Sequence, residues 1–338
     1  MAAPLPEARW LLELRLFLPP VLAALSAAAV DRLCAARGLL PPGFARLWRR
    51  AAGFLALAFF FWIALYGNLA NLGRAAPPLD LSHLSAPRLF LVHFLMIGTL
   101  AVWFLAGFAG VREPRPAPVP VRPDSPLPPA EPDPYELVEH AENAEALERT
   151  EVFPPPVLPP PPPPPRPSLG RVLAAQLGFL TPDLPHEIGL GVLVGVGSWF
   201  AVLLAAVVLA LLLYAFGAAG AAPQKPPELV VWIAGLPFAV RVLAALSAGV
   251  VEETFFRGFL QPRIGLWLST AFFVLGHLAY GQPLLLVGIA LLSLIYGQLV
   301  RWRQNIWPAI AAHALFDGVQ LLVVIPTTLK LLGKAAGG

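Results

Sequence analysis

The stretch Val250-Val-Glu-Glu-Thr-Phe-Phe-Arg-Gly-Phe-Leu-Gln261 places two carboxylates and a guanidinium inside a run that is otherwise apolar. A charged group at the centre of a bilayer costs roughly 2.5 kcal/mol or more, so such a cluster indicates a functional site. On a helix, Glu253 and Arg257 stand four residues apart with the acid first, which favours an ion pair. Glu252 points about 100° away and has no local partner. We therefore predict that Glu253 and Arg257 support the site and that Glu252 carries the chemistry.

The composition around this stretch is that of a membrane protein. Of the 338 residues, 57% are hydrophobic and only 13% are charged, which is more apolar surface than a soluble domain can bury. The net charge of +3 comes from basic residues scattered at the ends of apolar runs. This pattern is typical of membrane orientation signals, so we expect no nucleic-acid partner. The single cysteine, Cys34, excludes an intrachain disulfide. The expected fold class is all-α, a polytopic membrane helix bundle.

Apolar segments predict about eight transmembrane helices, three before a proline-rich linker and five after it. The predicted spans cover approximately residues 10–30, 51–72, 89–111, 188–216, a span from about 229 that runs into the stretch 250–261, and residues 264–280, 284–300 and 306–322. An N-terminal three-helix region therefore occupies residues 1–111, and a C-terminal five-helix region occupies residues 171–338. His83 and His93 lie beside or within the third span. We assign neither a role, because a lone histidine there is more often a packing residue.

Residues 112–170 form the linker between these regions, with an acidic patch at residues 131–151 and an unbroken proline run at residues 159–165. Such a sequence cannot form a packed core, so we predict an extended or disordered segment. The proline run favours a semi-rigid tether over a docking ligand for a protein partner that reads proline. Lysine and arginine residues in the short loops predict that the linker is cytoplasmic and that both termini lie outside.

Two later spans carry further polar groups at helical spacing. His277 follows Phe273 by one turn, and His313 and Asp317 are four residues apart on one face. Counted at about 1.5 Å per residue from the basic ends of their helices, these groups and Glu252 lie roughly 15 to 21 Å deep. A bilayer core is about 30 Å thick, so all of them fall in one layer near its middle. The pattern predicts one site to which three helices contribute.

The residue types at this site suit the hydrolysis of an acyl bond. Glu252 can take a proton from water as a general base, and His277 can help to position that water. His313 and Asp317 could then stabilise the oxyanion, although a carboxylate donates a hydrogen bond only when it is protonated. Alternatively, Glu252, His277 and His313 could ligate a divalent metal such as zinc, with an open position for water. The sequence leaves both routes open, and no cofactor is assigned.

Three patterns occur in a fixed order, each on its own predicted span: Glu252-Glu253-x-x-x-Arg257, Phe273-x-x-x-His277 and His313-x-x-x-Asp317. Together they resemble the motifs of the CPBP family of intramembrane proteases, which includes the CAAX prenyl endopeptidases and bacterial self-immunity proteins. The flanks Phe256-Arg-Gly-Phe-Leu260 and Trp307-Pro-Ala-Ile310 agree with that family's motif surroundings. The resemblance covers about residues 235–322, which form the predicted catalytic core.

The resemblance implies a role for each motif residue. Glu252 and His277 would activate water, His313 and the residue at position 317 would stabilise the intermediate, and the Glu253–Arg257 pair would support the site. The family more often has asparagine at the last position, where this chain has Asp317. Asparagine can donate a hydrogen bond to an oxyanion, whereas the carboxylate of Asp317 can do so only when it is protonated.

The leading prediction is an intramembrane endopeptidase that cleaves a membrane-protein or lipid-anchored peptide substrate in or near the lipid bilayer. The composition, rich in alanine, leucine, arginine and proline, resembles that of a bacterium of high genomic GC content. We therefore expect a location in the bacterial inner membrane and no prenylated CAAX substrate. Bacterial relatives associated with C-terminal sorting signals of surface proteins indicate a narrower role. The alternative from another class is a non-catalytic scaffold, immunity or transport-like protein that uses the polar groups for proton or ligand handling.

Overall fold

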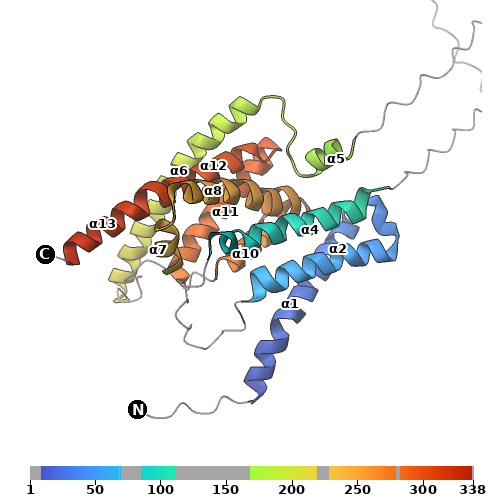
Figure 1. Cartoon of the computed structure of the whole chain (residues 1–338), viewed down its shortest axis with the longest axis horizontal. Coiled ribbons are helices and arrows are strands. Elements are labelled where there is room, and N and C mark those ends of the chain that lie inside the picture. The colour runs from blue at the N-terminus through green and yellow to red at the C-terminus, as the bar shows by residue number, and fades with distance from the viewer. Residues whose placement is uncertain are drawn as a thin grey trace, which may run out of the picture. The chain divides into compact units, whose positions relative to one another are not determined.

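Helices provide all the regular secondary structure of the residues described by the computed structural model of this protein (Figure 1). Those residues are 9–67, 69, 85–110, 168–218, 228–278 and 282–336. The elements are α1 (Arg9–Ala36), η1 (Pro42–Ala45), α2 (Leu47–Phe60), η2 (Phe61–Tyr66), α3 (Ala86–Leu89), α4 (Leu91–Phe108), α5 (Leu169–Gln176), α6 (Leu184–Ala215), α7 (Glu228–Ala234), α8 (Phe238–Ser247), η6 (Ala248–Glu252), η7 (Thr254–Leu260), α9 (Gln261–Ile264), α10 (Leu266–Gly276), α11 (Pro283–Arg303), α12 (Trp307–Val319), η9 (Gln320–Val324) and α13 (Ile325–Ala336). The predicted all-α fold class is confirmed. The predicted linker lies outside the described residues, except for residues 168–170.

Six helices of the described chain are long and apolar enough to cross a membrane. They are Glu13–Ala36, Leu47–Tyr66, Leu91–Phe108, Leu184–Ala215, Leu285–Arg303 and Trp307–Leu331. The most apolar is α6, with a mean hydropathy of 2.6. It begins where the side chain of Asp183 accepts a hydrogen bond from the backbone N–H of His186 at 3.1 Å, which satisfies a donor at the helix start. The chain is therefore a multi-pass membrane protein.

The predicted count of eight spans is not confirmed, because the fifth and sixth predicted spans differ from ordinary membrane helices. Residues 238–264 form one continuous helix, made of α8, η6, η7 and α9. This helix starts later than the predicted residue 229, because a break before Pro237 separates it from α7. It is about 40 Å long but carries several charged side chains. The helix α10 has 11 residues, or about 17 Å, which is shorter than the bilayer core.

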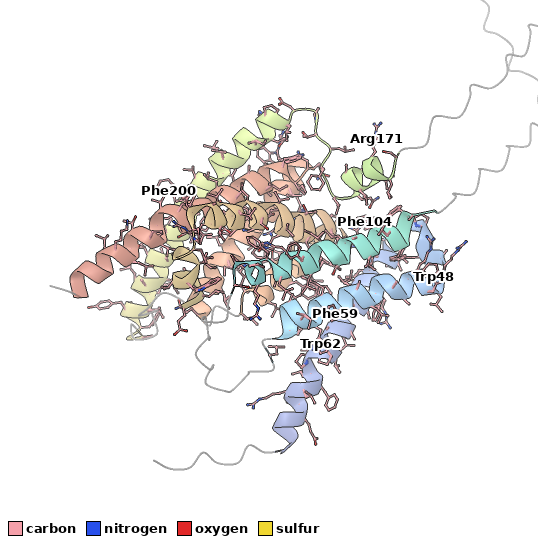
Figure 2. The ribbon with its side chains drawn as sticks, viewed as in Figure 1. Trp48, Phe59, Trp62, Phe104, Arg171 and Phe200 are labelled. Atoms are coloured by element: carbon pink, nitrogen blue, oxygen red, sulfur yellow. The ribbon has the colours of Figure 1, made fainter. Side chains whose placement is uncertain are left out.

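Large apolar side chains cover the outside of the spans. Trp48 and Phe59 of α2 and Phe200 of α6 extend away from the helices (Figure 2), and they are 64%, 49% and 65% exposed, respectively. Many other leucine, valine and phenylalanine side chains on α1, α4 and α6 are also exposed. A soluble monomer rarely exposes such continuous apolar area, whereas lipid accommodates it. These faces of the helices are therefore suited to contact lipid.

The N-terminal helices pack against the continuous helix through aromatic rings. Phe60 of α2 contacts Phe255 with ring centroids 4.4 Å apart, and Trp103 of α4 contacts Phe259 at 5.2 Å. All four side chains are buried, and an aromatic pair contributes about 0.5–1.5 kcal/mol beyond the area that it buries. The helices on both sides of the linker consequently belong to one compact unit. This packing brings α4 beside the paired glutamates.

The helix α12 approaches α6 and η6 closely at two glycines. A Cβ atom at Gly195 of α6 would lie 2.9 Å from the carbonyl oxygen of Ala312. A Cβ atom at Gly249 of η6 would lie 2.8 Å from both the carbonyl oxygen of Ile310 and the Cβ of Ala314. Small residues permit such close approach between membrane helices. The two contacts hold the middle of α12, where His313 lies, against the helix that carries the glutamates.

A polar turn fixes the start of α12. Gln304 ends α11 in the left-handed region, with φ of 57°, and the side chain of Asn305 accepts from the backbone N–H of Trp307 at 3.1 Å. Arg303 then donates through its Nη2 to Oε1 of Glu187 on α6 at 2.6 Å. The end of α11 is therefore anchored to α6 by an ion pair, and Asn305 caps the first turn of α12.

Candidate active site

Glu252 lies at the end of η6, where the helix makes wide π-type turns. Its Oε1 lies 3.3 Å from Nε2 of His93 on α4, and its side chain is 15% exposed. Its Oε2 has no hydrogen-bond partner among the residues that the structure describes. Turns of this type are frequent at functional sites, and a carboxylate oxygen without a protein partner can accept a hydrogen bond from water. One oxygen of Glu252 is thus held by His93, and the other is buried without a hydrogen-bond partner among the described residues.

His93 is a site residue that the sequence analysis missed. Its Nδ1 lies 2.6 Å from Oγ of Ser247, while its Nε2 faces Glu252. The contact with Glu252 joins residues that are 159 positions apart in the chain. No local spacing distinguishes His93 from His83, so only the packing of α4 against the continuous helix reveals it.

Glu253 is completely buried, and its Oε1 contacts two other ionisable groups. The Nη1 of Arg257 lies 2.9 Å away, and Nδ1 of His313 lies 2.7 Å away. A carboxylate of this kind accepts, so the His313 ring donates its Nδ1–H to it. The predicted Glu253–Arg257 ion pair is present, and the structure adds His313 to it. One buried network therefore links the continuous helix to α12.

Phe273 brings α10 into the same network. The guanidinium carbon of Arg257 lies 4.3 Å from the Phe273 ring centroid, and such a cation–π contact contributes about 0.5–2 kcal/mol. The ring centroids of His277 and His313 lie 4.6 Å and 6.2 Å from that of Phe273. The phenylalanine of the second motif is therefore the apolar surface around which Arg257 and both motif histidines pack.

His277 lies immediately after α10. Its Nδ1 is 2.7 Å from the carbonyl oxygen of Phe273. Because a carbonyl oxygen accepts only, the ring must donate its Nδ1–H there, and the Nε2 of the neutral ring is then an acceptor. An acceptor at Nε2 suits a histidine that binds a hydrogen of water.

The His313–Asp317 pair is looser than the Glu253 network. The Nε2 of His313 lies 3.5 Å from Oδ2 of Asp317, and the Asp317 side chain is 31% exposed. This distance exceeds that of an ordinary hydrogen bond. The two residues share one face of α12 as their spacing predicts, but Asp317 borders a more open region than Glu253 does.

The histidines His93, His277 and His313 all lie close enough to Glu252 to act electrostatically on its carboxylate. They come from α4, from the end of α10 and from α12, respectively. The structure thus brings together the groups that the sequence places at one depth in the membrane. It also adds a histidine from the N-terminal region.

The arrangement does not fit the metal site considered from sequence. Within the described part of the chain, no group of three or more histidine, cysteine, aspartate or glutamate side chains is arranged to hold a metal ion. For the trio Glu252, His277 and His313, the contacts of His313 explain why no such arrangement forms. The Nδ1 of His313 donates to Glu253, and its Nε2 lies 3.5 Å from Asp317, so both ring nitrogens of His313 face other carboxylates. No step below uses a metal.

Comparison with known proteins gives a family match for one part of the chain. Residues 234–319 match the family described as Type II CAAX prenyl endopeptidase Rce1-like. A segment of 79 residues is 32% identical to the uncharacterized protein YpbD of Bacillus subtilis (strain 168), and it covers 23% of this chain and 42% of that protein. The match therefore spans less than half the length of this curated relative. No solved structure gives a significant match.

The matched residues confirm the family resemblance that the three motifs predict. The segment 234–319 contains all six motif residues with proposed roles. His93 and the rest of α4 lie outside it. At the level of the family, the match supports a CAAX-type intramembrane protease.

Proposed function

We propose that this chain, whose residues 234–319 form an Rce1-like domain, is an intramembrane endopeptidase that hydrolyses a peptide bond of a membrane-associated substrate. The observation that carries the proposal is the unequal environment of the paired glutamates. Glu253 is buried against Arg257 and His313. Oε2 has no hydrogen-bond partner among the described residues in either glutamate, but the Glu252 side chain is 15% exposed and that of Glu253 is 0% exposed.

Glu252 is the proposed general base. Its Oε2 accepts a proton from water while the water oxygen forms a bond to the carbonyl carbon of the scissile peptide bond. The electrons of the carbonyl π bond move to the carbonyl oxygen, which gives a tetrahedral oxyanion. Glu252 then returns the proton to the amide nitrogen as the C–N bond breaks, so the base is regenerated. The acceptor Nε2 of His277 orients the same water through its second hydrogen.

His313 is the proposed donor to the oxyanion. Its Nδ1–H is fixed by the 2.7 Å contact with Glu253, so the direction of its Nε2 edge is also fixed. The 3.5 Å separation from Asp317 leaves an Nε2–H only weakly held, and a substrate oxygen can accept it. In this role the ring carries a proton on each nitrogen, which suits a ring placed between two carboxylates. A donor already aimed at the developing charge lowers the barrier without reorganisation.

The surroundings of the site indicate the substrate class. Val250, two residues before Glu252, is 44% exposed, so the helix that carries the base also has a face suited to lipid. A membrane protein or a lipid-anchored peptide can approach such a helix from within the bilayer. We place the protein in the bacterial inner membrane, with the processing of C-terminal sorting signals as the narrower role.

The test is cleavage by the purified protein in lipid nanodiscs, with a fluorogenic peptide that contains one transmembrane segment. Glu252→Gln keeps the side-chain shape but removes the base, and we expect at least about a 100-fold slower reaction. Glu228→Gln, at an exposed glutamate that begins α7, is the matched control and should cleave like the wild type. Cleavage by Glu252→Gln at the wild-type rate contradicts the proposal.

Two further measurements define the reaction. Activity that persists with a chelator supports the metal-free route, whereas a loss that zinc restores assigns the metal route. In cells, C-termini of membrane and surface proteins are compared between strains that produce the wild type or Glu252→Gln. Precursors that accumulate only with the variant identify the substrate. An unchanged set of C-termini, together with an uncleaved peptide, favours the non-catalytic scaffold.

A further inference from the structure

Ser247, His93 and Glu252 form a chain of polar contacts between α4 and the continuous helix. Oγ of Ser247 lies 2.6 Å from Nδ1 of His93, and Nε2 of the same ring lies 3.3 Å from Oε1 of Glu252. Both partners of His93 therefore belong to one helix, five residues apart in the sequence. The His93 side chain is 14% exposed, so the contacts are largely shielded from water.

The chemistry of the three groups assigns the protons along this chain. A serine hydroxyl can donate or accept, whereas a carboxylate only accepts. A neutral ring satisfies both contacts when Ser247 donates to Nδ1 and the ring donates its Nε2–H to Glu252. This arrangement occupies Oε1 of Glu252 and leaves Oε2, which has no hydrogen-bond partner among the described residues, as the proposed base.

We propose that His93 is a positioning residue for Glu252, supplied by α4 from outside the Rce1-like domain. The proposal rests on the proposed function of Glu252 as the base. A glutamate side chain has several rotatable bonds, and a hydrogen bond to one carboxylate oxygen restricts the direction of the other. Catalytic groups depend on such supporting contacts for their geometry. The N-terminal helices thereby complete the site instead of only enclosing it.

Packing alone does not account for His93. The helix α4 already buries Met96, Leu100, Trp103 and Phe104, and Trp103 contacts Phe259. A hydrogen bond contributes about 0.5–1.5 kcal/mol net to stability, which is no more than the burial of an apolar side chain contributes. An apolar side chain at position 93 would therefore hold α4 at least as well. The histidine is explained by what its Nε2 does for Glu252.

Two amide substitutions separate the roles of the ring nitrogens. In His93→Gln, the side-chain amide nitrogen lies near the place of Nε2 and can still donate to Glu252. In His93→Asn, it lies near the place of Nδ1, so it can reach Ser247 but not Glu252. The matched control is His186→Asn, at an exposed histidine near the start of α6. All variants are purified in lipid nanodiscs and compared by melting temperature before their kinetics are measured.

The kinetics use the fluorogenic transmembrane peptide. We expect His93→Asn to lower kcat about 10- to 100-fold, as is common for a supporting partner of a catalytic group, with KM changed by less than about twofold because substrate binding is untouched. His93→Gln should recover kcat to within about threefold of the wild type. Ser247→Ala tests the outer contact without altering the ring, and it should lower kcat less than His93→Asn does.

The outcomes separate this inference from the proposed function. Equal kcat values for His93→Asn and His93→Gln overturn the positioning role, even if Glu252→Gln is inactive. A loss in His93→Asn that appears in KM, or that follows its melting temperature, also overturns it, since the residue would then serve binding or structure. If Glu252→Gln cleaves like the wild type, the proposed function fails and the positioning role fails with it.

Discussion

Glu252 and Glu253 are consecutive residues, but their surroundings differ in burial and in partners. Glu253 is 0% exposed, and its Oε1 contacts both Arg257 and His313. Glu252 is 15% exposed, and its Oε1 meets His93. Successive residues of a helix point about 100° apart, so one carboxylate faces α12 and the other faces α4. The same residue type therefore lies in a fully buried ionic network, here called the closed side, and at a partly exposed position, the open side.

This difference shows how a charged motif can be accommodated inside a membrane helix. A buried carboxylate is tolerated when cationic and hydrogen-bonding partners surround it, and removing one partner is strongly destabilising. A reactive carboxylate instead needs contact with water, and Glu252 is the more exposed of the two glutamates, at 15% against 0%. The chain meets both needs with two adjacent glutamates, so we expect substitutions at them to separate stability from activity.

The largest effect on stability is expected at Glu253. Glu253→Gln removes the charge that Arg257 and His313 contact, and the guanidinium that remains is buried without compensation. Breaking such a network costs about 3–5 kcal/mol. Thermal unfolding in detergent should therefore show a large drop in Tm for this variant. The matched Glu252→Gln should change the unfolding free energy by about 1 kcal/mol or less while it abolishes cleavage. Equal melting temperatures for the two variants would remove the basis of the comparison.

The sequence predicts those parts of the site that depend on helix geometry alone. Residues four apart share a face of any α-helix, so the spacings of Glu253 with Arg257 and of His313 with Asp317 predict pairs that the structure contains at 2.9 Å and 3.5 Å. The all-helical membrane fold follows from composition for a similar reason. A chain this apolar must satisfy its backbone hydrogen bonds within lipid, and helices do so.

The contacts between helices could not be predicted in the same way. Glu253 meets His313 across 60 residues, and Glu252 meets His93 across 159. Such contacts depend on which helix faces pack together, which neither periodicity nor hydropathy specifies. The predicted spans show the same limit. Six described helices qualify as ordinary spans, whereas α10 is too short and the helix at residues 238–264 is too charged.

The second prediction tests whether the close packing of η6 against α12 positions the buried network around Glu253. Gly249→Ala places a Cβ 2.8 Å from the carbonyl oxygen of Ile310, so α12 must move away from η6. Overpacking of this kind costs about 1–3 kcal/mol. We expect a lower Tm together with a lower kcat, because His313 moves with α12. Gly197→Ala is the control, since its Cβ would meet nothing within 4 Å. A Gly249→Ala variant with the wild-type rate would show that the site tolerates this shift.

The third prediction concerns the planar guanidinium of Arg257 in the buried network around Glu253. Arg257→Lys keeps the positive charge, but a lysine ammonium cannot stack its plane on Phe273 as the guanidinium does at 4.3 Å. The loss should be about 1–2 kcal/mol, measured as a lower midpoint of chemical unfolding. Arg301→Lys, at an exposed position of α11, should have no measurable effect. If both variants unfold alike, the charge of Arg257 is sufficient and its planarity is irrelevant.

The smallest effect is expected at Asp317, which lies beside His313 of the buried network but is itself partly exposed. Its side chain is 31% exposed and lies 3.5 Å from Nε2 of His313, so solvent screening limits its contribution to stability to about 1 kcal/mol or less. Asp317→Asn keeps an acceptor oxygen beside the ring and gains an N–H donor that can reach the oxyanion. We expect kcat within about threefold of the wild type, whereas Asp317→Ala should be about tenfold slower, less than the loss of a direct oxyanion donor. A larger loss in Asp317→Asn than in Asp317→Ala would mean that the position works through neither hydrogen bond, and His313 alone would then define where the closed network meets the substrate.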